Sequence, residues 1–295
     1  MAAIALETLN AATPADFTAA LGDLFEHSPW IAEAVAPHRP FASLAALHAA
    51  MMTVVREAAH EQRLALIRAH PDLAGKAARG GTMTLDSVAE QSSAGLDQLS
   101  DEEYATFTRL NDAYRERFGI PFILCVRRHT KDSILRQFER RLANSPEAEI
   151  EAAIAEIGRI TALRLDQRVT APDRLPVHGR LSTHVLDTHS GRPAAGVAID
   201  LVEIAASGRH RLIARAVTNV DGRTDGPLIG GRPVPIGRYE LRFAVAPYFA
   251  AAGVPLADPP FLDTVPVAFA VAEPEGHYHV PLLVTPWSYA TYRGS

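Results

Sequence analysis

Hydrophobic positions along the chain follow two different periods, and the change between them divides the sequence in two. Up to about residue 166 they recur every three or four residues, which is the spacing of a buried helical face. The two clearest stripes are Leu44, Leu47, Met51, Val54 and Val55, and Tyr104, Phe107, Leu110 and Tyr114. Both stripes predict amphipathic helices whose apolar faces belong to a core.

Signals for helix starts support this prediction. Ser100 is followed three residues later by Glu103, which is the spacing of a capping box. Ser145 precedes Pro146, and proline is favoured in the first turn of a helix. The sequence therefore predicts an all-α N-terminal domain over residues 1–166.

Beyond this region the period changes to two. Residues 167–178 hold Pro172 and Pro176 among polar residues, and we interpret them as a linker. The alternating apolar runs are Leu181, Thr183 and Val185, then Val197, Ile199 and Leu201, then Tyr239, Leu241, Phe243 and Val245. With Gly and Pro between the runs, they predict an all-β sandwich over residues 179–295. The expected fold class is a multi-domain chain, all-α and then all-β.

Composition adds limits on function. The 295 residues carry 29 basic and 34 acidic side chains, a formal net charge of -5, with no long basic stripe for a phosphate backbone. We therefore expect no nucleic-acid partner.

The single cysteine, Cys125, lies in an apolar run and excludes a disulfide within the chain. Because no signal peptide and no run of about 18 apolar residues is evident, we expect a cytoplasmic protein without a membrane partner.

The strand region ends in a cluster of polar residues with chemical potential. His277 and His279 are two apart on an alternating strand, so they share one face. His184 faces away from its apolar neighbours, and Arg223 follows a turn sequence, Asn219-Val220-Asp221-Gly222. Taken alone, His184 is most simply a satisfied polar residue, and Arg223 is equally explained as a solvated hairpin residue. The three histidines could also supply nitrogen ligands to zinc, although no carboxylate or cysteine partner lies near the motif.

The motifs LSTHVLD, TNVDGR and HYHVPLL and the closing YRGS resemble the transthyretin-like 5-hydroxyisourate hydrolases. The resemblance implies His184, Arg223, His279 and Ser295 as catalytic residues, and Tyr292, Arg293 and Gly294 as substrate contacts. It also implies a metal-free channel between the subunits of a tetramer. Neutral imidazoles suit water activation near pH 7, and a guanidinium suits an oxyanion. Transthyretin itself is a carrier on this fold, so a binding protein is the alternative.

In the helical region, Ser87, Glu90 and Gln91 have the spacing i, i+3 and i+4 and share one face of a short helix over residues 85–94. His70 ends the preceding helix, where an imidazole could simply be a polar cap. A solvated surface explains the three-residue stripe equally well. The pattern alone leaves both interpretations open.

The motifs EHSPW, RPF, AHPDLAG, SVAEQSSAGL, FGIPFILCVRRHTKDSIL and ALRL resemble the decarboxylases of 2-oxo-4-hydroxy-4-carboxy-5-ureidoimidazoline (OHCU) over residues 7–166. The resemblance implies His70 and Glu90 as the catalytic pair. The implied substrate contacts are Pro71, Ser87, Gln91, Arg164 and the backbone of Phe122, Ile123, Leu124, Cys125 and Val126. We expect Glu90 to raise the pKa of His70, and Arg164 to hold a substrate carboxylate through two hydrogen bonds.

Together the two resemblances imply a bifunctional enzyme of urate degradation. The strand domain would hydrolyse 5-hydroxyisourate to OHCU, and the helical domain would decarboxylate OHCU to (S)-allantoin. The expected partners are these small-molecule substrates and further copies of the chain in a homo-oligomer through both domains. No cofactor or metal is expected. The alternative is a transthyretin-like binding or scaffold protein with one active catalytic domain.

Overall fold

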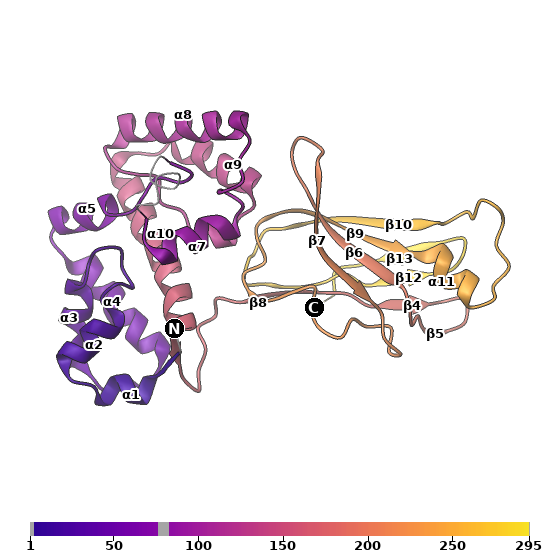
Figure 1. Ribbon diagram of the computed structural model, residues 1–295, viewed down its shortest axis with the longest axis horizontal. Coiled ribbons are helices and arrows are strands. Elements are labelled where there is room, and N and C mark those ends of the chain that lie inside the picture. The colour runs from indigo at the N-terminus through magenta and orange to yellow at the C-terminus, as the bar shows by residue number, and fades with distance from the viewer. Residues whose placement is uncertain (1–2, 76–82, 295) are drawn as a thin grey trace. The chain divides into compact units, whose positions relative to one another are not determined.

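The computed structural model describes residues 3–75 and 83–294 (Figure 1). Contacts between residues divide the chain into two compact units. The first, here the helical unit, comprises residues 1–127 and 133–177, and the second, the strand unit, comprises residues 128–132 and 178–295. Their contents confirm the expected fold class. None of the described helices is long and apolar enough to cross a membrane.

Two helices of the helical unit begin at the capping signals found in the sequence. Its helices are α1 Leu6–Ala11, α2 Pro14–Leu21, α3 Trp30–Val35, α4 Leu44–Glu57, α5 His60–Arg68, α7 Leu85–Ser93, α8 Asp101–Phe118, α9 Lys131–Arg141 and α10 Pro146–Arg168. Short 3-10 turns span Ala36–His38 and Val126–Arg128, and a parallel pair joins β1 Ile4–Ala5 to β2 Val169–Thr170. Ser100 and Glu103 form the capping box at the start of α8, and the Ser145 hydroxyl caps α10.

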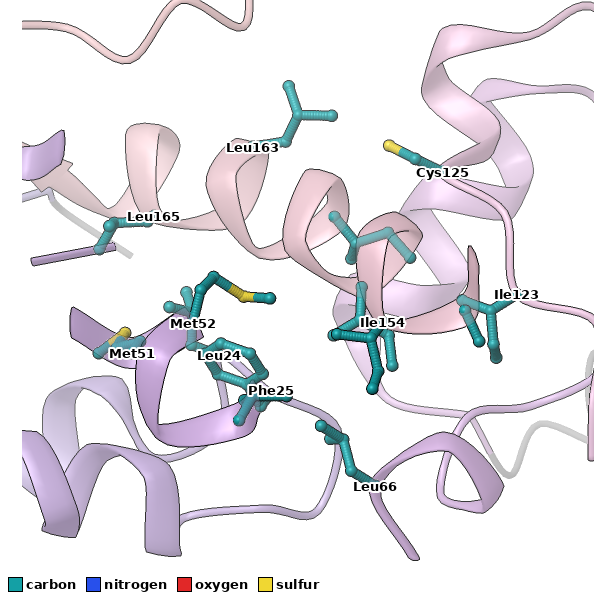
Figure 2. Packing of buried hydrophobic residues seen from close by; sticks show 14 of the residues in the cluster. Leu24, Phe25, Met51, Met52, Leu66, Ile123, Cys125, Ile154, Leu163 and Leu165 are labelled. Carbon is teal, nitrogen blue, oxygen red and sulfur yellow. The ribbon is translucent and has the colours of Figure 1, made fainter. Parts of the chain in front are cut away.

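The core of this unit lies between α4, α10 and the segments around them. Leu44, Leu47, Met51 and Val55 of the predicted α4 stripe are fully buried, while Val54 is half-buried. Figure 2 shows Met52 of α4 and Ile154 of α10 within one cluster of buried side chains. Each such side chain contributes about 1.5–3 kcal/mol of burial, so packing fixes α10, the helix that carries Arg164.

The strand unit is a set of short sheets with one small helix. Its strands are β3 Gly179–Ser182, β4 Val185–Asp187, β5 Arg192–Pro193, β6 Ala198–Ile204, β7 His210–Val217, β8 Ile229–Arg232, β9 Gly237–Ala244, β10 Thr264–Val271, β11 His277–His279, β12 Leu282–Val284 and β13 Tyr289–Thr291. Their orders are β10-β9-β6-β7, β11-β3-β8 and β13-β12-β4-β5. The strand expected to include Val245 stops one residue earlier, because Val245 begins helix α11 (Val245–Ala251) and its side chain packs in the core from there.

Two parallel pairs position the candidate residues of this unit. Strand β11 pairs with β3, so that His279 lies opposite Ser182, and β12 pairs with β4. Between the paired strands the Thr183 hydroxyl donates to the Val280 carbonyl, and the Leu282 N–H donates to the His184 carbonyl. These two bonds therefore hold the backbone in place between β3 and β4, where His184 lies.

Candidate active sites

A pocket in the helical unit gathers most of the residues expected there. It is lined by His70, Pro71, Leu73, Ser87, Glu90, Gln91, Phe122, Ile123, Leu124, Val126, Ile160 and Arg164. The expected face of α7 is present, since Ser87, Glu90 and Gln91 all line the pocket. Cys125 is buried but is not part of this lining; its backbone N–H donates to Glu156 Oε2 at 2.9 Å. Leu73 and Ile160 complete the apolar wall.

Arg164 is the electrostatic centre of this pocket. Its Nε and one terminal nitrogen donate to the two carboxylate oxygens of Glu90, each at 2.8 Å. Its other terminal nitrogen donates to Glu26 at 3.2 Å and to the Leu24 carbonyl at 3.3 Å. Arg164 was expected to hold a substrate carboxylate through two hydrogen bonds. In this structure the carboxylate that accepts these two bonds is that of Glu90. The side chain is only 4% exposed, so this cation is held by protein carboxylates in a poorly solvated place.

Glu26 is a member of this site that sequence reasoning did not single out. Its carboxylate accepts hydrogen bonds from Thr84 Oγ1 at 2.7 Å, from Ser87 Oγ at 3.2 Å and from Arg164. Burial raises its pKa, but the bond from Thr84 and the Arg164 charge outweigh this, and the pKa of Glu26 is lowered. Glu26 belongs to the quoted motif EHSPW, which is the signal in the sequence that could have identified it.

His70 lies at the pocket with one ring nitrogen free to act. Its Nδ1 lies 3.0 Å from the Leu66 carbonyl, and because a carbonyl can only accept, Nδ1 carries the hydrogen. Its Nε2 is buried and has no hydrogen-bond partner among the described residues. The residue as a whole is 6% exposed. With respect to the described residues, His70 therefore presents an unpaired lone pair on Nε2.

The expectation that Glu90 raises the pKa of His70 is wrong. Burial lowers the pKa of His70 to about 4, and it outweighs both the bond to Leu66 and the attraction of Glu26. Glu90 has no such effect because its carboxylate is paired with Arg164. The imidazole is consequently neutral at physiological pH.

Gln91 holds the segment that carries His70. Its Oε1 accepts from the Ala74 N–H at 2.8 Å, and its Nε2 donates to the Asp72 carbonyl at 3.2 Å. Ala74 has a positive φ of 54°, which is unusual for a residue with a Cβ. The side-chain amide thus connects α7 to the turn after α5. Gln91 therefore has a structural contact in addition to the substrate contact expected of it.

The strand unit contains a row of four hydrogen-bonded side chains. His184 Nδ1 lies 2.7 Å from His279 Nε2, and Ser182 Oγ lies 2.9 Å from His279 Nδ1. The same hydroxyl lies 3.1 Å from His277 Nε2. His277 and His279 therefore share a face, as the alternating strand predicted. Ser182 was not singled out from the sequence, although it belongs to the quoted motif LSTHVLD.

Arg223 is placed against His184 by its turn. The two residues form an isolated antiparallel bridge, and Gly222 adopts a φ of 68° with no room for a Cβ, which would lie 2.4 Å from the Val185 carbonyl. The pKa of His184 is lowered by burial and then by the Arg223 charge. The pKa of His279 is lowered by burial, then by His184 and Arg223. Both rings are thus biased toward the neutral form.

A pocket lies beside these residues in the strand unit. Its lining includes Ser182, Arg223, His277 and His279, together with Arg180 and Asp225.

The C-terminal segment reaches His279 through Gly294. The Gly294 N–H donates to the His279 carbonyl at 2.8 Å, and a Cβ on Gly294 would lie 2.8 Å from the imidazole Cδ2. Arg293 stacks over the Tyr278 ring, with its guanidinium carbon 4.7 Å from the centroid, and Tyr292 is exposed. Ser295 lies outside the described residues. The structure brings the end of the chain to the imidazole pair by its backbone.

The zinc alternative receives no support from the geometry. Among the described residues, no three His, Cys, Asp or Glu side chains are grouped so that they could hold a metal ion. His184 Nδ1 and His279 Nε2 face each other at 2.7 Å and share a hydrogen, so these two nitrogens are engaged with each other.

Comparisons with known proteins divide the chain at the same place as its hydrophobic period. The profile of the OHCU decarboxylase family matches residues 10–166, and that of the HIUase/Transthyretin family matches residues 181–294. A 2-oxo-4-hydroxy-4-carboxy-5-ureidoimidazoline decarboxylase of Haloferax volcanii is 42% identical over 168 residues, 57% of this chain and 98% of the relative. The 5-hydroxyisourate hydrolase 2 of Rhizobium meliloti is 55% identical over 117 residues, 40% of this chain and 97% of the relative.

One solved structure is similar to both halves at once. A crystal structure of (S)-allantoin synthase is 35% identical to the chain, with a TM-score of 0.52. The match covers 99% of this chain and 100% of that one. The order of the two regions along the chain is therefore found in a known protein.

Proposed function

Because this chain belongs to the OHCU decarboxylase family and to the HIUase/Transthyretin family, we propose that it is a bifunctional enzyme that hydrolyses 5-hydroxyisourate and decarboxylates the resulting OHCU to (S)-allantoin. The observation that carries the proposal is that each family region has its own pocket lined by titratable side chains. We assign decarboxylation to a domain of residues 1–166 and hydrolysis to a domain of residues 179–295, joined by residues 167–178.

In the helical unit, His70 is our candidate for the proton-transferring group. Loss of carbon dioxide breaks a carbon–carbon bond and leaves its electron pair on the substrate ring, where a proton must later be added from one face. The Nε2 of His70, which is unpaired among the described residues, can take a hydroxyl proton from the substrate as the bond breaks and return it to carbon. A neutral imidazole is required for the first step, and the lowered pKa of His70 supplies it.

Glu90 and Arg164 would orient the substrate in the same pocket. The guanidinium can bind an anionic substrate group, but such a group has to compete with Glu90 for the same two nitrogens. Displaced from Arg164, the Glu90 carboxylate is free to accept or shuttle a proton beside His70. Pro71, Ser87 and the wall from Phe122 to Val126 would enclose the ring.

In the strand unit, the imidazole pair is our candidate for activating water. One neutral ring removes a proton from water as the oxygen attacks the cyclic carbonyl, and the departing ring nitrogen takes up a proton as its bond to the carbonyl carbon breaks. Arg223 lines the pocket and would stabilise the oxyanion that develops on the carbonyl. The C-terminal residues Tyr292 to Ser295 would close the site next to His279.

We also propose that the chain forms a homo-oligomer. Leu212 and Val217 on β7, the edge strand of its sheet, are 45% and 57% exposed. Exposed apolar side chains on an edge strand are covered when copies of the chain associate. Size-exclusion chromatography with light scattering tests this, and a monomer at micromolar concentration would contradict it.

The test of both activities is to supply freshly generated 5-hydroxyisourate and follow its absorbance together with the optical activity of the product. We expect rapid decay and a single-handed product. His70→Asn should leave the decay fast and the product racemic, whereas Arg223→Ala should slow the decay. The alternative, a binding or scaffold protein with one active domain, predicts that one of the two signals remains at the spontaneous rate in the parent.

A further inference from the structure

Two polar side chains extend the imidazole pair of the strand unit beyond the residues that the proposed hydrolysis uses. Ser182 and His277 continue the hydrogen-bonded row from His279 toward the surface. We propose that Ser182 is a positioning residue that sets the tautomer of His279, and that Ser182 and His277 form a relay that carries a proton away from the His184–His279 pair. This inference rests on the proposed hydrolase activity.

The numbers of donors and acceptors in the row make the tautomers of the three histidines depend on one another. A neutral imidazole has one N–H and one lone pair, and a hydroxyl has a single O–H. If Ser182 donates to His279 Nδ1, then His279 Nε2 donates to His184, and His277 Nε2 donates to Ser182. If Ser182 donates to His277 instead, every bond in the row reverses. Only these two arrangements satisfy all three contacts, so the hydroxyl links the two ends.

The switch between the arrangements transports one proton. A proton taken from water at His184 Nε2 allows the Nδ1 hydrogen of His184 to move to His279 Nε2. The Nδ1 hydrogen of His279 then moves to the Ser182 oxygen, and the hydroxyl hydrogen moves to His277 Nε2. The Nδ1 hydrogen of His277 leaves to solvent. Each step breaks and forms one bond to hydrogen, and the row ends with the charge that it began with.

The burial and charges around the row favour proton transfer from His184 toward His277. Ser182 is 8% exposed, and the pairing of β3 with β11 holds it opposite His279. His277 is exposed, so the outer end of the row meets solvent. The charges of Arg180 and Arg223 act on His279 and disfavour a proton resting there, which promotes its onward transfer.

The decisive variants are Ser182→Ala and His277→Asn. We expect Ser182→Ala to lower kcat of hydrolysis by about 10²-fold with little change in KM, in the range of lost acid–base catalysis. For His277→Asn we expect a smaller loss, which added imidazole buffer restores by accepting the proton from the Ser182 hydroxyl and releasing one to solvent. Ser182→Thr keeps the hydroxyl and should recover most of the rate. Thr183→Val removes a neighbouring buried hydroxyl that donates to a backbone carbonyl, and it measures the purely structural loss.

A second readout does not depend on activity. The ¹⁵N chemical shifts of His279 report which ring nitrogen carries the hydrogen, and we expect Ser182→Ala, but not Thr183→Val, to change them. Unchanged shifts, or equal rate losses in these two variants, would overturn the inference. If the parent protein did not hydrolyse 5-hydroxyisourate, the proposed function would fail, whereas the ¹⁵N spectra would still decide whether Ser182 sets the tautomer. Circular dichroism of the same samples shows that each variant is folded, and their decarboxylation rate serves as an activity control in the other unit.

Discussion

Replacing Gly294 with Ala should disable the proposed hydrolysis through a single carbon atom. The added Cβ would lie 2.8 Å from Cδ2, 3.2 Å from Cβ and 3.3 Å from Cγ of His279. Carbon atoms in contact are separated by about 3.5–4.0 Å. The ring and the backbone of Gly294 must therefore separate by roughly 0.7 Å or more. The hydrogen bonds from His279 to His184 and Ser182 stand in the way of that movement.

The expected loss follows from this displacement. A misplacement of about 1 Å in a catalytic site costs on the order of 10²-fold in rate, which corresponds to about 2.7 kcal/mol of activation free energy. Folding should hardly change, because the affected segment is the last of the described chain and is largely exposed. Gly294→Ala should thus resemble a catalytic variant more than a destabilised one.

The assay is the decay of 5-hydroxyisourate absorbance at matched protein concentration. Ala290→Ser, on the exposed strand β13, adds an atom to the same terminal segment and serves as the matched control. Decarboxylation by the same sample reports on the other unit, and circular dichroism on folding. A hydrolysis rate for Gly294→Ala within about threefold of the parent would refute the placement of Gly294 against a working imidazole.

Further predictions address each site separately. His70→Asn or Glu90→Ala should stop stereoselective decarboxylation but not hydrolysis, and a single-handed product at the normal rate would remove these residues from the mechanism. Deleting residues 292–295 should abolish hydrolysis while decarboxylation continues; equal hydrolysis rates would exclude the tail from the site. Because folding lowers the pKa of His70 from 6.5 to about 4, its neutral form is favoured by folding, and acidification through this window should cost the parent up to about 3 kcal/mol of unfolding free energy that His70→Asn does not lose. Denaturant titrations at pH 7 and pH 4.5 measure the difference. Extensive chelation should leave both activities intact, and a loss that zinc restores would support the metal interpretation.

Local patterns in the sequence were enough to predict several of the elements. The stripe from Leu44 to Val55 and the capping box at Ser100 predicted α4 and the start of α8, since both depend on residues within a few positions of each other. The same locality explains the error at Val245. An apolar residue that ends an alternating run gives no sign that the chain will turn there into helix α11.

The candidate sites were predictable only where a motif or a helical face placed residues together. Ser87, Glu90 and Gln91 could be grouped because three and four residues along a helix return to the same side. Glu26 could not be joined to them, because its partners Ser87 and Arg164 are 61 and 138 residues away. The pKa of His70 was likewise out of reach, since burial, which sets it, is a property of the packed unit.

The sequence by itself determined the two periods, the helix starts and the motifs of two families, because these are short-range features that the chain carries before it folds. Only the tertiary structure decided how the polar groups are used. It paired Arg164 with Glu90, left His70 Nε2 without a described partner, and aligned Ser182 between His277 and His279. Hydrogen bonds depend on tenths of an ångström between atoms that packing and strand register bring together, and no spacing along the chain contains that information.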